Sequence, residues 1–263
     1  MPVPKVRHLA ALGSSFASGP GIEPFADKRA WRSSRNYAHL LAERLGCDLT
    51  DLTVAGATTA TILERPQRML WRTFPPQLSR LPRDADLVTV TAGGNDLDYI
   101  GSMIALSYRA WLSQRRTTRV LAPLVARHGL PALTKSVLDQ TASNLVAIVA
   151  AITRQAPGAR VVLVDYLTVL DADTPTSPDA PFPAAIRDAL RAVAGGLADA
   201  FAGAAKLSGA ELVAMSRLSE GHGVGSAHPW VNAFIPKQPT ASFHPTIEGM
   251  NAVADAVINY LDS

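Results

Sequence analysis

Five short apolar runs constrain the fold of this 263-residue chain more than any other feature. The runs lie at 6–12, 49–54, 87–92, 160–167 and 211–215. Several are rich in β-branched residues and all are too short for helices, which is typical of strands buried on both faces of a parallel sheet. Because segments with helical periodicity alternate with these strands, the sequence predicts a doubly wound α/β sheet.

The helices between these strands are predicted from apolar residues that recur on one helical face. We expect helices at 33–45, 137–155, 184–207 and 246–261, with the apolar stretch 99–131 helical in two pieces. Gly46 is the expected stop of the first, and Pro157-Gly158 ends the second. Composition does not change along the chain, so we expect one domain over 1–263.

Composition and charge exclude several classes of protein. Hydrophobic residues make up 48% of the chain and charged residues 18%, which is too apolar for a disordered chain. The net charge of +3 comes from scattered basic residues with no basic and aromatic stripe, so nucleic acid is not an expected partner. The single cysteine, Cys47, excludes an intrachain disulfide and a zinc cluster of thiolates.

Neither a membrane span nor a leader is expected from the sequence. No run of about 18 apolar residues is present, so we expect no transmembrane helix. The first 12 residues lack the long apolar core and cleavage site of a signal peptide. The expected location is therefore cytoplasmic for the chain as numbered, or secreted if a leader was removed, and the expected state is a monomer.

Residues suited to acyl transfer follow the expected strands. In an open parallel sheet, ligands bind beyond the carboxyl ends of the strands. Ser15 follows the first strand, Gly56 the second and Asn95 the third, and the long loop after the fifth strand ends at His244. A serine that attacks a carbonyl, a histidine that takes its proton and N–H donors that hold the oxyanion would form such a site.

Each of these residues also has a purely structural interpretation. Ser15 suits a helix N-cap, Gly56 and Asn95 suit turns, and His244 before Pro245 suits the end of a loop. Four such residues at matching strand ends are much less expected by chance, which favours the functional interpretation.

Four sequence blocks carry a resemblance to the SGNH hydrolases, also called the GDSL esterase/lipase superfamily. The first block is Leu12-Gly13-Ser14-Ser15, and the second contains Gly56. The third is Gly93-Gly94-Asn95-Asp96 and the last is His244-Pro245. The segments 35–37 and 229–232 also resemble the actinobacterial-type esterases of this group.

The resemblance implies a three-layer α/β/α sandwich with a five-stranded parallel sheet of flavodoxin-like order. It implies a serine esterase with Ser15 as nucleophile and His244 as general base and acid. The Ser15 N–H, the Gly56 N–H and the Asn95 side-chain amide would form the oxyanion hole. Neither a cofactor nor a metal is implied, and the expected substrate is a small-molecule or lipid ester.

The chain departs from the family pattern at two positions. Ser14 stands where the family usually has an aspartate, and we interpret that aspartate as structural. Ala241 stands where the family usually has an aspartate three residues before the histidine. A histidine base still needs an acceptor on its Nδ1–H. We expect the Ala241 carbonyl in that place, with Asp173 or Glu220 as the alternative, and a pKa of His244 near the ordinary value of about 6.5.

Substrate selection and rival functions rest on weaker signals. Met103 and Ile104, which follow Asn95, and Trp230 are candidate walls of an acyl pocket, although Met103 and Ile104 also suit a helix core face. His222 and His228 lack typical zinc-ligand spacing, so no metal is expected. The rival functions are a lipase or phospholipase for long acyl chains, an inactive binding domain of this fold, and an acyltransferase.

Overall fold

The computed structural model describes residues 6–69, 72–114, 117–125, 129–131 and 133–263. A five-stranded sheet lies at its centre, in the order β4-β1-β7-β8-β9, and all of its pairings are parallel. The strands are β1 (His8–Gly13), β4 (Asp48–Asp51), β7 (Leu87–Thr91), β8 (Arg160–Val164) and β9 (Glu211–Val213). The predicted parallel sheet is thus confirmed, with each strand close to its expected run.

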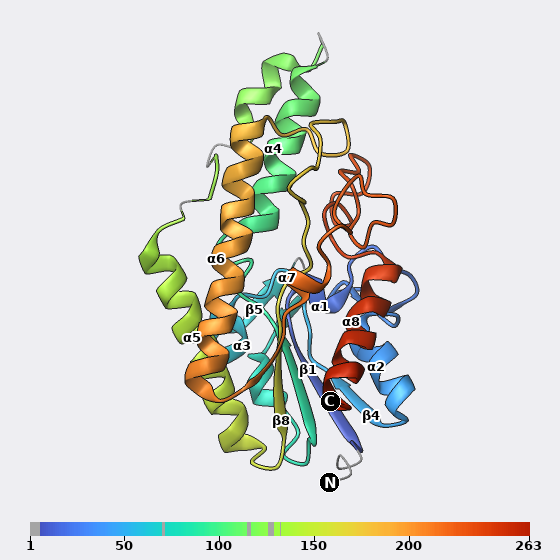
Figure 1. Cartoon of the computed structure of the whole chain (residues 1–263), viewed down its shortest axis with the longest axis vertical. Coiled ribbons are helices and arrows are strands. Elements are labelled where there is room, and N and C mark those ends of the chain that lie inside the picture. Colours follow the sequence, from blue (N-terminus) through green and yellow to red (C-terminus); the bar gives the residue numbers. More distant parts are fainter. Residues whose placement is uncertain (1–5, 70–71, 115–116, 126–128, 132) are drawn as a thin grey trace.

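Helices cover both faces of the sheet (Figure 1). One layer contains α2 (Tyr37–Leu45) and α8 (Ile247–Leu261), which pack against each other. The other layer contains α3 (Thr59–Leu63), α5 (Lys135–Gln155) and α6 (Ala184–Ser208), with α5 packed between α3 and α6. The remaining helices are α1 (Ser15–Ser18), α4 (Tyr99–Ser113), α7 (Met215–Leu218) and the 3₁₀ turns η1 (Gln77–Arg80) and η2 (Arg119–Leu124). The structure confirms the three-layer α/β/α architecture.

Local signals explain where the helices begin and end. Gly46 closes α2 with φ of 62°, as expected, whereas Asn36 rather than a serine caps its start by accepting from the His39 N–H. Thr246 caps α8 by accepting from the Gly249 N–H. The helices α5 and α6 match their predicted ranges within two residues.

Two short hairpins and four short helical segments lie outside the predicted elements. The hairpins pair β2 (Phe25–Asp27) with β3 (Arg32–Ser33) and β5 (Gln67–Met69) with β6 (Arg72–Phe74). The helical segments are α1, α3, η1 and α7. Strands of two or three residues are too short to show an alternation of apolar and polar residues. The stretch 99–131 is helical in two pieces, α4 and η2, as far as the structure describes it.

Helix α5 is long and apolar enough to cross a membrane by length and composition alone. It buries Leu145, Ile148, Val149 and Ile152 along one face, and it packs against α3 and α6. Helix α5 is therefore buried along one face, as a helix that covers one side of a sheet is.

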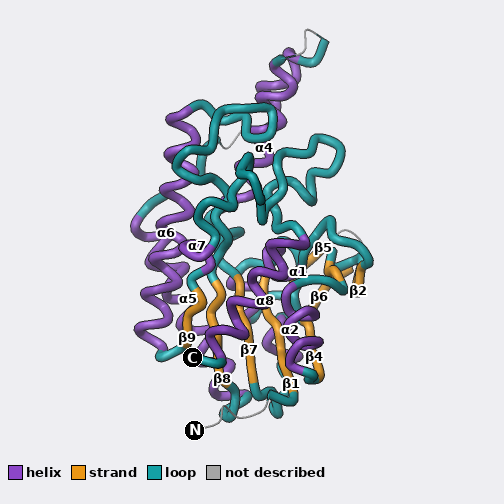
Figure 2. The backbone as a smooth tube through the Cα atoms, turned by 45° about the vertical axis from the view of Figure 1, so that its right-hand side comes forward, coloured by secondary structure: helices purple, strands orange, loops and turns teal. Residues whose placement is uncertain are grey.

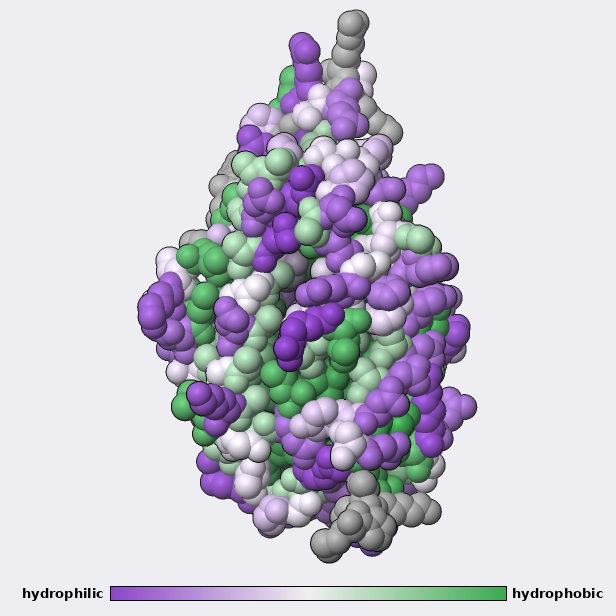
Figure 3. All heavy atoms as spheres, in the orientation of Figure 1, coloured by the Kyte–Doolittle hydropathy of each residue, from purple (hydrophilic) through white to green (hydrophobic). Residues whose placement is uncertain are grey.

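Loops gather beyond the carboxyl ends of the strands, at the end of the molecule opposite the C-terminus (Figure 2). Apolar side chains lie at the centre of the surface that carries α6 and α8, and hydrophilic side chains border them (Figure 3). Ser15, Gly56 and Asn95 follow β1, β4 and β7, and His244 lies on the loop between α7 and α8. The residues identified from the sequence therefore lie at this carboxyl edge of the sheet.

Candidate active site

The end of β1 is shaped so that the chain can turn sharply into α1. The N–H of Gly13 donates to Gln77 Oε1 at 2.8 Å, and Gln77 Nε2 donates to the Gly13 carbonyl at 2.9 Å. One side chain thus satisfies both backbone groups, as a neighbouring strand would. A Cβ on Gly13 would lie 2.5 Å from the carbonyl oxygen of Thr91, so only glycine fits there.

Ser15 is the first residue of α1 and is nearly buried, with 8% of its surface exposed. The first N–H groups of a helix have no intrahelical acceptor. Within the described part of the chain, the Ser15 N–H and the Gly56 N–H both lack a hydrogen-bond acceptor. Gly56 is exposed and has φ of 76°, a conformation that glycine adopts without strain. Two backbone donors are therefore available at this edge.

The loops after β4 and β7 are bound to each other. Asn95 Nδ2 donates to the Ala57 carbonyl at 2.8 Å, which uses one of its two N–H groups and leaves the second. The Asp96 carboxylate accepts from the backbone N–H of Thr59, at 3.0 Å, and from the Thr59 hydroxyl. Asn144 of α5 donates to the same hydroxyl at 2.8 Å. These bonds hold Asn95 in register with the Gly56 loop.

His244 lies on the loop that leads into α8, and a backbone carbonyl fixes its tautomer. Its Nδ1 lies 2.9 Å from the carbonyl oxygen of Ser242. Because a carbonyl only accepts, Nδ1 must carry the proton, and Nε2 is left as the acceptor. Phe243, between them, has φ of 60°, a left-handed turn that directs the Ser242 carbonyl towards the ring two residues later.

This finding corrects the expected partner of His244. The acceptor is a backbone carbonyl, but it belongs to Ser242 and not to Ala241, whose carbonyl accepts from the His244 backbone N–H at 3.1 Å. Neither Asp173 nor Glu220 bonds to the ring; both line a separate hollow instead. The sequence gives the path of the chain past the histidine but not the direction in which each carbonyl points.

Burial changes the protonation of His244. Its surroundings leave 6% of the residue exposed, and this desolvation lowers its pKa to about 4. The hydrogen bond to Ser242 raises the pKa, but less than burial lowers it. The expectation of a pKa near the ordinary value is therefore wrong, because the sequence does not show how deeply the ring is buried.

The His244 loop is braced against the residues before it and against α1. Asn232 donates to the His244 carbonyl from its backbone N–H, at 2.8 Å, and from Nδ2, at 3.1 Å. The ring of His244 lies 5.7 Å from that of Phe16, the residue after Ser15. Among the described residues no hydrogen bond joins Ser15 Oγ to His244 Nε2; such bonds are often long in enzymes without substrate.

The residues expected to line an acyl pocket pack against the core or against another side chain. Met103 is fully buried in the hydrophobic core and Ile104 packs against that core. Trp230 stacks on His222, with ring centroids 3.8 Å apart. None of the three lines the hollow described next, and their role in substrate binding stays a prediction.

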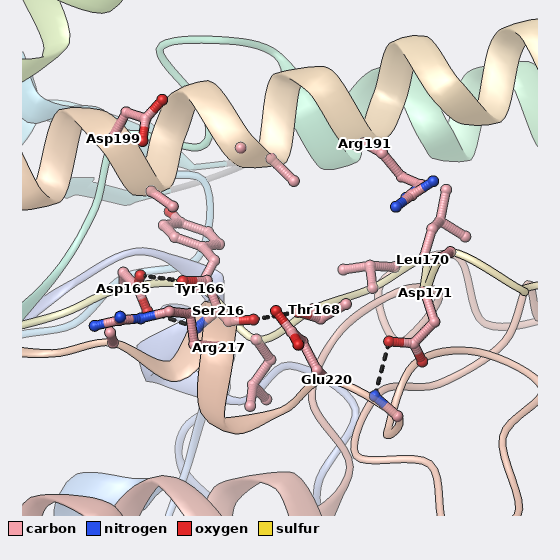
Figure 4. A pocket seen from close by; sticks show the side chains of 18 of the residues that line it. Asp165, Tyr166, Thr168, Leu170, Asp171, Arg191, Asp199, Ser216, Arg217 and Glu220 are labelled. Atoms are coloured by element: carbon pink, nitrogen blue, oxygen red, sulfur yellow. Dashed lines mark hydrogen bonds between the residues drawn. The ribbon is translucent and has the colours of Figure 1, made fainter.

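A hollow of about 860 Å³ lies apart from the proposed catalytic residues (Figure 4). It lies between α6 and the loops after β8 and β9, and neither Ser15 nor His244 lines it. Asp165 lines it, and burial raises the pKa of this carboxyl to about 6, although the N–H and the hydroxyl of Ser216 bond to it. The candidate site lies instead at the backbone N–H donors and at His244, which are the groups that acyl transfer needs.

In the described part of the chain, no group of three or more His, Cys, Asp or Glu side chains is placed to hold a metal ion. His222 Nδ1 bonds instead to the His228 carbonyl at 2.7 Å. Sequence reasoning missed Tyr166 and Gln77. A tyrosine at the carboxyl end of the fourth apolar run was the available signal for the first; nothing in the sequence marked the second.

Comparison with known proteins shows the family of this chain. Residues 11–252 match the model of the GDSL-like lipase/acylhydrolase family. Lipase 2 of Streptomyces coelicolor is 31% identical over 258 residues, which cover 95% of this chain and 84% of that protein.

Two solved structures share the fold. The extracellular lipase from Streptomyces rimosus superposes with a TM-score of 0.67 at 24% identity, covering 97% of this chain and 99% of that one. Phospholipase A1 from Streptomyces albidoflavus has a TM-score of 0.74 at 20% identity, covering 98% and 100%. Because the family model matches residues 11–252 of the 263, this chain belongs to the GDSL-like lipase/acylhydrolase family and is a carboxylic ester hydrolase.

Proposed function

We propose that the protein hydrolyses acyl esters through a covalent intermediate on Ser15. His244 Nε2 takes the proton from Ser15 Oγ as the oxygen attacks the ester carbonyl. The resulting oxyanion is held by the N–H groups of Ser15 and Gly56 and by the second N–H of the Asn95 amide. His244 then donates its proton to the leaving alcohol, and a water activated in the same way releases the acid.

The observation that supports this proposal most is the 2.9 Å contact between His244 Nδ1 and the Ser242 carbonyl. It leaves Nε2 unprotonated, and burial keeps the ring neutral above a pH of about 4. A neutral acceptor fixes the tautomer but stabilises the imidazolium less than a carboxylate would. The pair Ser15 and His244, with a carbonyl in place of the third member, is thus the proposed catalytic unit.

A fluorophosphonate probe with mass spectrometry tests the nucleophile directly. The expected result is one covalent adduct on Ser15 that disappears in Ser15→Ala and is retained in Ser14→Ala. An adduct on Ser14, or none on a protein that remains folded by circular dichroism, would contradict the proposal. The second outcome would instead support the rival of an inactive binding domain.

The acyl group is proposed from the relatives. Lipase 2 of S. coelicolor is named for lipid hydrolysis, which supports the long-chain alternative, whereas the geometry supports ester cleavage without a preference for length. A series of p-nitrophenyl esters from acetate to palmitate separates the two. A rise of kcat/KM with chain length supports a lipase, and a fall beyond butyrate supports a carboxylesterase. Preferential transfer to an added alcohol would indicate an acyltransferase.

We also propose that the protein is secreted and has one catalytic domain. The S. rimosus protein is described as extracellular, which favours the secreted alternative for this chain. The family match over residues 11–252 supports one catalytic domain. Immunoblots of culture medium and cell extract of the source organism, and a single unfolding transition in calorimetry, test the two proposals.

A further inference from the structure

The Tyr166 hydroxyl joins the two loops on which the proposed mechanism depends. Tyr166 follows β8 and is almost fully buried. Its hydroxyl oxygen accepts from the Gly94 N–H at 3.0 Å and lies 3.0 Å from Ser14 Oγ. Ser14 directly precedes Ser15, and Gly94 directly precedes Asn95. One phenol oxygen is therefore one residue away from the nucleophile and one residue away from an oxyanion donor.

The Ser14 side chain bonds to Tyr166 instead of capping helix α1. It occupies the N-cap position of α1, where a serine usually accepts from a backbone N–H of the first turn. Here its side chain makes no such cap and bonds to Tyr166 instead. The backbone of Ser14 is fixed independently, because its N–H donates to the Thr91 carbonyl at 2.9 Å. The side chain is thus free to serve the contact between the loops.

The shape of the third block fits the same contact. A Cβ on Gly94 would lie 2.8 to 2.9 Å from three atoms of the Tyr166 ring and hydroxyl. Only glycine at this position lets the backbone N–H reach the phenol. The Tyr166 ring also packs 4.7 Å from the ring of Phe16, which lies 5.7 Å from that of His244. The tyrosine therefore touches the loops after β1 and β7 from its own position after β8.

Tyr166 does not take part as an acid or base. Burial raises its pKa to about 12, and the bonds to Ser14 and Gly94 lower it by less, so the phenol stays protonated over the working range of an esterase. Its hydrogen bonds are between neutral groups and do not change with pH. The contact is suited to holding a distance and not to moving a proton.

We propose that Tyr166 is a positioning residue, and that its hydroxyl, bridging Ser14 and Gly94, sets the separation between the nucleophile and the Asn95 oxyanion donor. The inference rests on the proposed roles of Ser15 and Asn95. It also explains how a chain with serine in place of the family's usual aspartate keeps the first block in place. The short Ser14 side chain can make this contact because the longer Tyr166 side chain extends to within 3.0 Å of it.

The test compares Tyr166→Phe, which keeps the ring and removes only the hydroxyl, with the wild type. We expect kcat to fall about 10- to 100-fold with KM within about twofold, because the lost alignment affects the transition state and not ground-state binding. The rate of fluorophosphonate labelling of Ser15 should fall in parallel. The matched control is Tyr37→Phe, which removes an equally buried hydroxyl bonded to Thr89 and Thr91, and which should lower the melting temperature without this loss of kcat.

A double-mutant cycle separates positioning from general stability. Ser14→Ala should lower kcat by up to about 10-fold alone, and by less than about twofold in the Tyr166→Phe background, because the contact is already absent there. Wild-type kcat in Tyr166→Phe, additive losses in the cycle, or an equal loss in Tyr37→Phe would overturn the proposal. Loss of labelling in Ser15→Ala tests the nucleophile separately, so failure of the proposed function is distinguished from failure of this inference.

Discussion

The two sides of the candidate site are held by different means. The oxyanion side, which comprises the loops that carry Ser15, Gly56 and Asn95, is bound together by side-chain hydrogen bonds from three other elements. The base side is the loop that carries His244, and there a single backbone carbonyl orients the ring while burial sets its charge. Donors aimed at a developing charge must be fixed in advance. The base must reach the nucleophile in the right tautomer and stay neutral at the working pH.

The largest effect should follow loss of the nucleophile. Ser15→Ala is expected to lower kcat by about 10⁶, as removal of the nucleophile does in other serine hydrolases. Ser14→Ala is the matched control and should lose far less, since its hydroxyl only joins two loops. Steady-state kinetics on one activated ester measure both. If Ser14→Ala were the more damaged variant, the assignment of the first block would be displaced by one residue.

The next effect tests the oxyanion side. Asn95→Ala removes a donor aimed at charge that develops in the transition state, so kcat should fall by about 10²–10³ with little change in KM. Asn144→Ala, which removes only the donor behind Thr59, should have a much smaller effect. A change confined to KM in Asn95→Ala would assign the residue to ground-state substrate binding.

The pH dependence tests the base side. Burial disfavours the imidazolium, so the pKa of His244 is lowered and the active neutral form is present above a pH of about 4. The value of kcat/KM should therefore rise as pH increases through about 4 and stay flat through 6.5. At pH 5 about 90% of the limiting rate is expected, against about 3% for an unperturbed histidine. A rise centred near 6.5 would mean that the ring is more hydrated than this packing implies.

The smallest effects are expected at Asp173 and Glu220, the two carboxylates that the sequence offers as alternative partners of His244. Asp173→Asn and Glu220→Gln should keep kcat within about twofold, because neither side chain bonds to His244 and removal of a true triad acid costs about 10⁴. Ala241→Gly should be similarly quiet, since Ser242 supplies the carbonyl. A loss near 10⁴ in either carboxylate variant would show that a carboxylate approaches the ring during turnover.

The sequence predicts those parts of the molecule that follow from periodicity. The sheet, the long helices and the convergence of residues after three strands could be predicted, because β-branched runs and helical faces repeat over many residues. The sequence predicts the Ala241 carbonyl as the partner of His244, whereas the structure has the carbonyl of the next residue, Ser242. The left-handed conformation of Phe243 turns that carbonyl towards the ring, and no sequence pattern marks this turn. The shift of the histidine pKa and the role of Tyr166 depend on burial and on contacts between distant segments.

The Gln77 side chain bonds to both backbone groups of Gly13 at the end of β1 through an uncharged amide. This bears on how the geometry of the site responds to ionic strength. Tyr166, Asn95 and Gln67, which donates to the Ala55 carbonyl at 2.7 Å, also hold their loops through neutral groups. Salt screens interactions between charges and leaves hydrogen bonds between neutral groups almost unchanged. These neutral contacts around the nucleophile should therefore keep their geometry in concentrated salt. The Asp96 carboxylate, which accepts from the Thr59 N–H and hydroxyl, is the charged member of this framework.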